Sequence, residues 1–295
     1  MNFEAYLRSS QARVGAALDR LLPAQEGPQA TVARAMRYAV LGGGKRLRPT
    51  LVLASCEACG GRAHDALAPA AAIEMIHTYS LIHDDLPAMD NDDYRRGRPT
   101  VHKAFGESVA ILAGDGLLTS AFEILGTEPA GDALALRRTE AVATVARAAG
   151  ISGMVGGQIA DLESGREVAD AEALDWIHRH KTGALLAACA EVGAIHAGAG
   201  GSKRTSLRRY GEAVGLAFQI ADDILDLTST REALGKTPGK DHRSGKATYP
   251  ALFGVEASHL EAERLVARAL SELAPFREEA APLAALARYA VSRSS

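Results

Sequence analysis

The chain has 295 residues, of which 47% are hydrophobic, so it can bury a large core as one big domain or as two ordinary ones. Lys and Arg number 33 against 36 Asp and Glu, which gives a net charge of −3 without a basic block, so we expect no nucleic-acid partner. The N-terminus is amphipathic, and no uncharged apolar run approaches about 18 residues, so we expect neither a signal peptide nor a membrane span.

Helical periodicity runs along nearly the whole chain. The first predicted helix covers residues 1–23, and apolar residues recur at helical spacing in segments such as 67–82. Alternating Val, Ile and Thr runs, which are typical of strands, are missing. About ten helices are predicted to be separated by Gly and Pro clusters at 23–28, 42–44, 97–99, 127–131, 198–201 and 235–239. No linker or repeat marks a boundary, so we predict an all-α fold, with a single large helical bundle over residues 1–295.

The three cysteines, Cys56, Cys59 and Cys189, cannot all pair, and such sparse usage is typical of a reducing, cytoplasmic compartment. Cys56 and Cys59 have the C-x-x-C spacing of some metal and redox sites. No second cysteine pair, no paired histidines and no βαβ pattern accompany them. We therefore predict two thiols on a core helix.

A glycine-rich segment, GGGKRLRP at 42–49, precedes a helix that can begin at Pro49. Its backbone N–H groups, the helix dipole and three cationic side chains, those of Lys45, Arg46 and Arg48, can together surround an oxyanion. A Walker A loop would need Gly at position 39 and Ser or Thr at 46, where this chain has Ala39 and Arg46. The segment therefore favours a phosphate site and does not support a nucleotide site.

The first acidic cluster contains Asp84, Asp85 and Asp90. On a continuous helix, residues 84 and 90 would point about 240° apart. Pro87 removes a backbone donor and disfavours helical geometry before it, so we predict a bulge that returns Asp90 towards Asp84. Such oxygen ligands select Mg²⁺ rather than Zn²⁺. A calcium loop starting at Asp90 fails because Tyr94 takes the fifth ligand position and no glycine stands at the sixth.

The second acidic cluster contains Asp222, Asp223 and Asp226, within a helix predicted over residues 214–227. Residues 222 and 226 are one turn apart, so their carboxylates share a face. A charge run usually forms a solvated face. Here the flanking residues are apolar nearly all round, so we expect this helix to be largely buried and its carboxylates to need cations.

Basic residues accompany both clusters. Arg95 and Arg96 directly follow the first cluster, and Lys181 and Thr182 interrupt an Ala-rich helix. Any one Lys or Arg is more often a solvated surface residue. Together, carboxylates for a metal and separate cations for a bare phosphate indicate two anionic substrate groups that are bound in different ways.

In chain order, these motifs resemble those of the polyprenyl diphosphate synthase family. The segments are GGGKRLRP at 42–49, HTYSLIHDDLPAMDNDDYRRGRPTVH at 77–102, GDGLL at 114–118, GGQIADL at 156–162, KTG at 181–183, FQIADDILD at 218–226 and GKTPGKD at 235–241. They look most like the bacterial farnesyl diphosphate synthase branch, with the plant-type geranylgeranyl enzymes close by. The resemblance implies an isoprenoid synthase fold with the active site in a central cavity.

The resemblance also implies a reaction, the head-to-tail condensation of isopentenyl diphosphate with an allylic diphosphate through an allylic carbocation. Mg²⁺, with three ions per active site, would be shared by Asp84, Asp90 and Asp222, with Asp85 close by and Asp223 and Asp226 supporting the opposite wall. The metal would stabilise charge as the C–O bond breaks. The departing pyrophosphate would take the final proton.

The substrate contacts follow from the same resemblance. Arg95, Lys181 and Lys236 would hold the allylic diphosphate, and isopentenyl diphosphate would lie, without metal, against Gly44, Lys45, Arg48, His77 and Arg96. The carbonyl near Lys181 and the side chains of Thr182 and Gln219 would face the carbocation in a dry site. Taken alone, His77 is as compatible with a core histidine, and only its place in the motif indicates a substrate contact.

Product length would depend on the helix before the first cluster, where Tyr79 and Ser80 stand five and four residues before Asp84. A helix rises 1.5 Å per residue, so Tyr79 lies about 7 Å from Asp84, where a bulky ring can stop the growing tail. We therefore predict a C15 product. The alternative is that Tyr79 only packs and the product is C20, as in the plant-type enzymes, which tend to carry a small or flexible residue there.

Other classes of protein remain open at this point. A terpene cyclase or head-to-head synthase would share the fold and the metal motifs but would not explain the second basic set. A non-catalytic partner subunit could lose metal ligands, whereas this chain keeps both clusters. The family implies a homodimer. Residues 230–246, with Lys236, Lys240 and Lys246, are predicted to close over the diphosphates as a lid.

Overall fold

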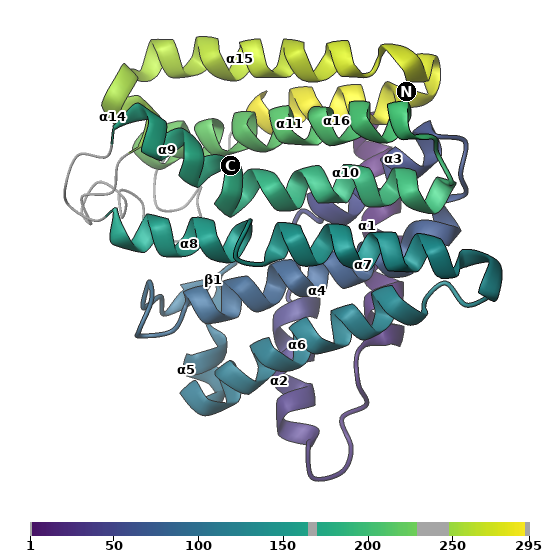
Figure 1. Cartoon of the computed structure of the whole chain (residues 1–295). Coiled ribbons are helices and arrows are strands. Elements are labelled where there is room, and N and C mark those ends of the chain that lie inside the picture. The colour runs from purple at the N-terminus through teal and green to yellow at the C-terminus, as the bar shows by residue number, and fades with distance from the viewer. Residues whose placement is uncertain (1, 165–169, 229–247, 293–295) are drawn as a thin grey trace.

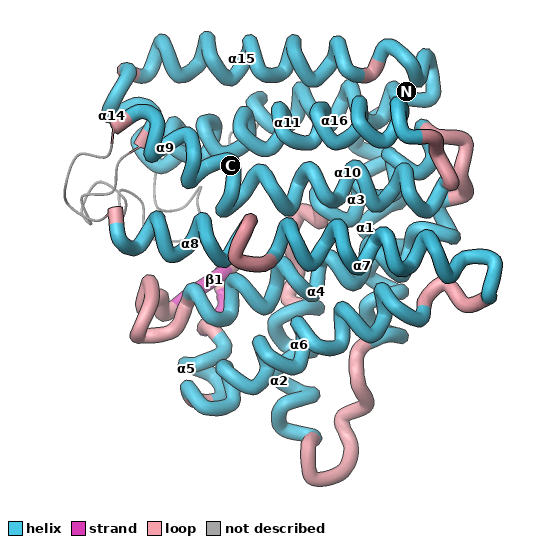
Figure 2. Tube along the Cα trace, viewed as in Figure 1, coloured by secondary structure: helices cyan, strands magenta, loops and turns pink. Residues whose placement is uncertain are grey.

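The computed structural model describes residues 2–164, 170–228 and 248–292, and helices dominate this part of the chain (Figures 1 and 2). The α-helices are α1 (Phe3–Leu21), α2 (Ala30–Leu41), α3 (Leu47–Ala58), α4 (Leu67–Asp84), α5 (Val101–Phe105), α6 (Glu107–Thr127), α7 (Ala135–Ala149), α8 (Met154–Glu163), α9 (Ala171–Ile177), α10 (Ala184–Ala197), α11 (Gly201–Thr228), α14 (Tyr249–Phe253), α15 (Val255–Glu272) and α16 (Ala281–Ser292). Short 3-10 turns occupy Ala63–Ala66, Asp132–Leu134 and Ala274–Ala280, and a π-helical turn, the π turn, occupies His178–Gly183. The all-α prediction is confirmed.

Several helices end at the predicted Gly and Pro clusters, whereas the breaks after α3, α5, α7 and α15 fall outside them. The side chain of Asn2 caps α1 by accepting a hydrogen bond from the Ala5 N–H at 3.1 Å, and α1 ends just before the first proline cluster. Gly43 and Gly44 follow α2 with φ of 93° and 123°, which other residues rarely adopt. Gly198 ends α10 in the left-handed conformation. The predicted break at 235–239 lies outside the described residues.

Two details differ from the sequence prediction. Strands β1 (Tyr94–Arg95) and β2 (Arg98–Pro99) form a small antiparallel hairpin, whose turn residues Arg96 and Gly97 both have positive φ. A strand of two residues is too short to show the alternation of apolar and polar residues by which strands are predicted from a sequence. The helix of the second acidic cluster begins at Gly201 instead of residue 214, because Leu207 and Tyr210 extend its buried face by two further turns.

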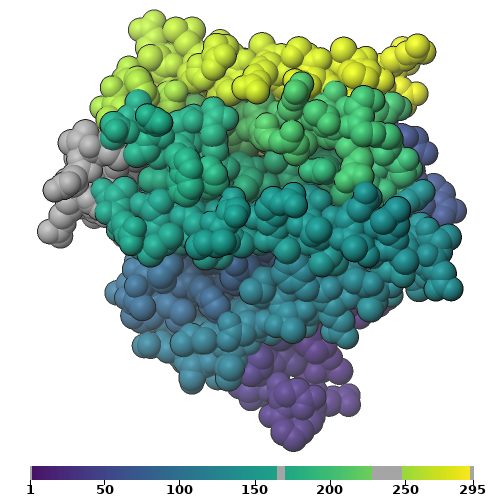
Figure 3. Space-filling model, viewed as in Figure 1, coloured from purple at the N-terminus to yellow at the C-terminus, as the bar shows by residue number. Residues whose placement is uncertain are grey.

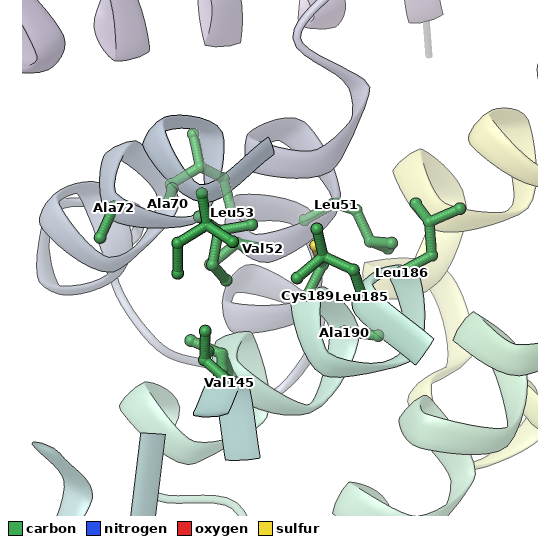
Figure 4. Packing of buried hydrophobic residues seen from close by; sticks show 14 of the residues in the cluster. Leu51, Val52, Leu53, Ala70, Ala72, Val145, Leu185, Leu186, Cys189 and Ala190 are labelled. Carbon is green, nitrogen blue, oxygen red and sulfur yellow. The ribbon is translucent and has the colours of Figure 1, made fainter. Parts of the chain in front are cut away.

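Helices α7, α10, α11 and α15 lie side by side in Figure 1, whereas α2 runs across their direction. On the face seen in Figure 3, the colour changes from purple for the N-terminal part of the chain to yellow for its C-terminal part. One cluster of buried side chains extends from Val14 to Ala290. At its centre, Leu51 and Leu53 of α3 pack with Leu185 and Cys189 of α10, beside Ala residues of α4 (Figure 4).

Helix α4 carries the first acidic cluster out of this core. Residues 68–76 of α4 are all buried, and the helix becomes half-exposed only towards its end at Asp84. It packs against α1, α3 and α6. An apolar helix buried on all sides thus fixes the position of the polar turn that follows it.

Among the described helices, α6 alone is long and apolar enough to cross a membrane, and 39% of that stretch is buried. Asp115 interrupts the apolar run of this helix, so no span was predicted there from the sequence. Core helices pass the same test, and α6 packs along α4 and α2. Its composition is therefore weak evidence for a membrane span.

The cysteines are free thiols, with Cys56 and Cys189 buried and Cys59 half-buried. Burial raises the pKa of Cys56 to about 12 and that of Cys59 to about 11. Such thiols are protonated at neutral pH. The prediction of a core helix is confirmed for Cys56, which lies buried within α3, whereas Cys59 is the half-buried residue just after the helix.

Candidate active site

The first acidic cluster surrounds the turn that ends α4. Asp84 is the last helical residue, and the Asp90 N–H donates to the Asp84 carbonyl oxygen at 2.8 Å. The Asn91 N–H donates to the Leu86 carbonyl oxygen at 3.1 Å, so the chain closes a compact loop around Pro87. Pro87 has no N–H to continue the helix. The predicted return of Asp90 towards Asp84 is confirmed.

Asp85 lies in different surroundings from Asp84. Its carboxylate is 4% exposed and accepts hydrogen bonds from Nε and Nη2 of Arg95 at 2.6–2.9 Å. Burial raises the pKa of Asp85, and the Arg95 guanidinium opposes that rise. Burial would lower the pKa of Arg95, but the Asp85 carboxylate raises it overall. The guanidinium keeps its proton, so we describe the two groups as an ion pair, which positions Arg95.

The hairpin carries Arg96 onto the glycine segment. Arg96 donates to the Gly43 carbonyl oxygen, and a Cβ at Gly44 would lie 2.7 Å from the Arg96 guanidinium carbon. Only glycine permits this approach. Arg48 Nη1 lies 3.3 Å from His77 Nε2. Burial holds the pKa of His77 well below its usual value, and Arg48 and Arg96 lower it further, so the neutral ring accepts a hydrogen bond from Arg48.

Arg46 was expected to join Lys45 and Arg48 around an oxyanion, but it turns inward from the same segment because Glu74 pairs with it in the core. Its Nη1 donates to Glu74 Oε1 at 2.5 Å, with side chains 7% and 2% exposed, and its Nη2 donates to the Val40 carbonyl oxygen. Arg46 adopts φ of 53° just before α3. This buried ion pair fixes the glycine segment against α4, while Lys45 stays exposed.

The π turn carries Lys181 and Thr182. A Cβ at Gly157 of α8 would lie 2.2 Å from the Lys181 backbone nitrogen, and a Cβ at Gly215 of α11 would lie 2.7 Å from the Gly183 Cα. Glycine at these positions lets α8 and α11 pack directly against the turn. The predicted interruption of the Ala-rich helix is therefore a π bulge, a feature that is frequent at functional sites.

Helix α8 joins the first acidic cluster to the π turn. Gln158 Nε2 donates to Asp84 Oδ1 at 2.5 Å, and Lys181 Nζ donates to Asp161 Oδ2 at 2.6 Å. Gln158 and Asp161 were not predicted as site residues, although both belong to the segment GGQIADL. Two polar residues three apart in an otherwise apolar segment share a helix face, and this spacing was the available signal.

A hydrogen-bonded chain links the π turn to α11 and α14. Thr182 Oγ1 donates to Gln219 Oε1 at 2.9 Å, and Gln219 Nε2 donates to Asp223 Oδ1 at 3.0 Å. Asp223 Oδ2 accepts from the Tyr249 N–H at 2.9 Å and lies 3.5 Å from His178 Nε2. Burial lowers the pKa of His178 to about 4. Asp223 is 4% exposed, and its carboxylate therefore holds Gln219 and the start of α14 in place.

A cavity of about 420 Å³ connects several of these residues. Its polar lining comes from Arg48, His77, Asp84, Gln158, Lys181 and Thr182. Much of its apolar lining comes from Tyr79, Met154, Val155 and Ile159. The polar Ser80 also lines the cavity. The cavity thus combines cations, a carboxylate and an apolar wall.

Other predicted site residues do not line this cavity, as described. Asp90, Asp222 and Asp226 are half-buried, Gln219 lies behind Thr182, and Arg95 lies beside Asp85. Asp222 and Asp226 are one turn apart on α11, as predicted. Lys236 and the predicted lid at 230–246 lie outside the described residues.

The sequence model of one protein family, described as Polyprenyl synthetase, matches residues 29–281. The chain belongs to this family. Among its curated relatives in the polyprenyl synthetase family, a dimethylallyltranstransferase of Fischerella ambigua is 49% identical over 99% of this chain and 84% of its own length. A geranylgeranyl diphosphate synthase of Cyanophora paradoxa is 48% identical over 100% of this chain and 97% of its own length. The large subunit of a heterodimeric geranylgeranyl pyrophosphate synthase of Arabidopsis thaliana is 46% identical over 100% of this chain and 80% of its own length.

Solved polyprenyl synthetase structures share the fold. An FPP/GFPP synthase of Zymomonas mobilis superimposes with a TM-score of 0.89 at 41% identity, covering 99% of each chain. A geranyltransferase of Helicobacter pylori, complexed with magnesium and isoprenyl diphosphate, gives 0.85 at 31% identity, covering 98% of this chain and 97% of its own. The predicted isoprenoid synthase fold and prenyltransferase class are therefore confirmed.

The acidic residues of this polyprenyl synthetase fit Mg²⁺. Their donors are carboxylate oxygens, which a hard cation prefers. Within residues 2–164, 170–228 and 248–292, no three His, Cys, Asp or Glu side chains lie close enough together to hold a metal by themselves. Mg²⁺ usually takes one or two carboxylates and completes its shell with water and substrate phosphates.

Proposed function

We propose that this polyprenyl synthetase condenses isopentenyl diphosphate head to tail with dimethylallyl and geranyl diphosphates and stops at farnesyl diphosphate, a C15 product. The 420 Å³ cavity carries the proposal, because Asp84, Lys181 and Arg48 lie at its polar side and the rest of its wall is largely apolar. A cavity of this kind suits a substrate with a diphosphate head and a hydrocarbon tail.

The allylic diphosphate would lie between the two acidic clusters. Asp84 and Asp90 on one side and Asp222 on the other would hold Mg²⁺, with three ions per active site when substrate is bound. Bound Mg²⁺ would supply the positive charge that stabilises the diphosphate as its C–O bond breaks. Lys181, oriented by Asp161 at 2.6 Å, would add a cation to the same head group.

Other residues of this half of the site act through their neighbours. Arg95 would hold the allylic diphosphate with its position fixed by Asp85. Asp223 and Asp226 would support the second acidic wall, and we assign Lys236 to the same diphosphate by family resemblance alone.

Isopentenyl diphosphate would lie against the glycine segment and the hairpin, where Gly44, Lys45, Arg48, His77 and Arg96 supply the contacts. The neutral His77 ring orients Arg48 by accepting its hydrogen bond. Arg96 reaches this place because Gly44 leaves room for its guanidinium. Guanidinium groups bind phosphate oxygens through paired N–H donors, so this half of the site needs no metal.

The carbocation would form near the π turn. Gln219 donates to Asp223, so its Oε1 faces Thr182 and extends a chain of dipoles towards the cavity. The Lys181 carbonyl, Thr182 and Gln219 would stabilise the positive charge, and the apolar wall would exclude water. The departing pyrophosphate would accept the final proton.

The C15 product rests on Tyr79, which is 7% exposed and lines the cavity beside Ser80. A second candidate is a C20 product, because the relative from Cyanophora paradoxa is named a geranylgeranyl diphosphate synthase. We expect Tyr79→Ala to shift the main product from C15 to C20 or longer, since it removes the ring that limits the tail. Analysis of the prenyl alcohols released by phosphatase would show this shift, and an unchanged C15 profile would remove Tyr79 from the proposal.

The reaction itself has a direct test. Purified protein is incubated with Mg²⁺, isopentenyl diphosphate and dimethylallyl diphosphate, and the released alcohols are identified. Linear C15 alcohol supports the proposal, and a C20 alcohol supports the second candidate. A cyclic hydrocarbon would point to a terpene cyclase. No product at all would point to a partner subunit without activity of its own.

We further propose a cytoplasmic homodimer. Ile111 and Leu112 of α6 are 45% and 54% exposed, and Val155 and Ile159 of α8 are similarly exposed at the rim of the cavity. A second copy of this chain is the occupant we assign to α6 by family resemblance, and a relative 46% identical along this whole chain, named the large subunit of a heterodimeric synthase, supports pairing of such chains.

A further inference from the structure

His83 stands between the cavity and α6. Its Nε2 lies 3.1 Å from the Ile111 carbonyl oxygen and 3.8 Å from a carboxylate oxygen of Asp115. Its ring meets the Tyr79 ring edge to face, with centroids 5.7 Å apart and planes at 82°. Both rings line the 420 Å³ cavity. His83 therefore contacts α6 on one side and supports Tyr79 on the other.

The ring occupies this place only because residue 114 of α6 is glycine. A Cβ at Gly114 would lie 2.1 Å from Nε2 and 2.5 Å from Cδ2 of His83, whereas ordinary contact begins at 3.4 Å. At Gly126, on the same helix, a Cβ would meet nothing within 4 Å. Gly114 is thus a seat for the His83 ring, and Gly126 is a glycine without such a role.

We propose that His83, seated on Gly114, is a specificity-determining residue that sets product length by holding the Tyr79 ring across the tail cavity. The inference rests on the proposed function and adds a second residue to it. A phenol ring can turn about two side-chain bonds, so it blocks a tail only while its neighbours prevent it from turning. Within the described residues, the His83 ring is the one aromatic group in contact with Tyr79.

The first test removes the His83 ring. His83→Ala is assayed with Mg²⁺, isopentenyl diphosphate and geranyl diphosphate, and the C20 to C15 ratio of the released alcohols is measured. We expect this ratio to rise about two- to tenfold, the factor that corresponds to one edge-to-face aromatic contact. Because His83 acts through Tyr79, adding His83→Ala to Tyr79→Ala should leave the Tyr79→Ala product profile unchanged.

The second test disturbs the seat. In Gly114→Ala the new methyl group displaces the His83 ring away from α6 and into the cavity, so we expect shorter products, with a raised C10 to C15 ratio from dimethylallyl diphosphate. In the His83→Ala background the methyl group has no ring to displace, and this change should disappear. Gly126→Ala is the matched control and should retain the wild-type profile and melting temperature.

A purely structural role for His83 would lower turnover or stability and leave the product ratios unchanged, and that result overturns the inference. It is overturned equally if Gly114→Ala shortens the product to the same extent without His83. If His83→Ala folds poorly, the same product ratio is measured in His83→Asn, which keeps a polar group near Ile111 but lacks the ring. If Tyr79→Ala lengthens the product but His83→Ala leaves the product ratio unchanged, this inference alone is rejected. If the wild-type protein makes no prenyl product, the proposed function is rejected.

Discussion

Asp84 and Asp85 are adjacent in the chain but lie in different surroundings. Asp84 lines the cavity, while Asp85 is buried against Arg95. On α11, Asp223 is likewise buried in a hydrogen-bonded chain, and Asp222 and Asp226 beside it are half-buried. Successive helical residues point about 100° apart, so a run of carboxylates divides into groups that face the site and groups that hold the protein around it.

The buried pair of Arg46 and Glu74 should be among the most sensitive contacts in the chain. Glu74→Gln removes one charge and leaves the Arg46 guanidinium buried, so we expect a loss of about 3 kcal/mol in the free energy of unfolding. Urea denaturation measures this change. Glu261→Gln, which faces Arg264 at the surface, is the control and should cost less than about 1 kcal/mol. Equal losses for the two variants would contradict the inward orientation of Arg46.

His178 should make the stability of the protein depend on pH. Burial lowers its pKa to about 4 in the folded protein, against about 6.5 in the unfolded chain. Above pH 6.5 the ring is neutral in both states. As the pH falls from about 6.5 to about 4, only the unfolded chain binds the proton, so about 3 kcal/mol of stability is lost across this window.

Unfolding free energies of the wild type and His178→Gln between pH 7 and pH 4.5 test this prediction. The variant should show a flatter dependence on pH than the wild type. His259→Gln, at an exposed position, is the control and should follow the wild-type curve. Parallel curves for all three proteins would show that His178 is not the group responsible.

At the scale of elements, the site depends on how closely α8 and α11 approach the π turn. Gly157 and Gly215 remove the side chains that would hold these helices apart. The approach brings Gln158 to Asp84 and Asp161 to Lys181. A sequence pattern predicted that the helix is interrupted at Lys181, but the form of the interruption, a π bulge, follows from the packing around it.

Gly157→Ala should therefore disable the site. Its Cβ would lie 2.2 Å from the Lys181 nitrogen, a backbone atom that cannot move aside as a flexible side chain could. We expect about 100-fold lower kcat/KM, because small displacements of catalytic groups carry penalties of that order. Gly15→Ala in α1, where a Cβ would meet nothing within 4 Å, is the control and should leave kcat/KM unchanged. A fully active Gly157→Ala enzyme would show that α8 can move away from the π turn without lowering kcat/KM.

At the scale of the whole molecule, buried residues from Val14 to Ala290 form one cluster, and we propose that residues 1–295 make up a single domain. The apolar residues left outside this cluster include Ile111 and Leu112 on α6. Since α6 also carries Gly114, the proposed dimer surface and the proposed product-length wall lie on the same helix.

Leu112→Glu should shift the homodimer towards monomer, because a carboxylate would have to be buried at the interface. Size-exclusion chromatography with light scattering measures the mass in solution. Leu260→Glu on α15, where the leucine is 63% exposed, is the control and should keep the wild-type mass. A monomeric wild type would reject the proposed assembly.

Local sequence signals, which are 3.6-residue periodicity and Gly and Pro punctuation, were enough to predict the helical class, several helix ends and the one-turn pair on α11. The return of Asp90 was also predictable, because Pro87 acts on its own neighbours. Packing between helices, by contrast, is what turns Arg46 to Glu74, brings Gln158 and Asp161 of α8 into the site and places the His83 ring against Gly114. Those contacts join residues 20 to 74 positions apart, or pair a side chain with a glycine on another helix, and no local pattern encodes which distant partner packing will supply.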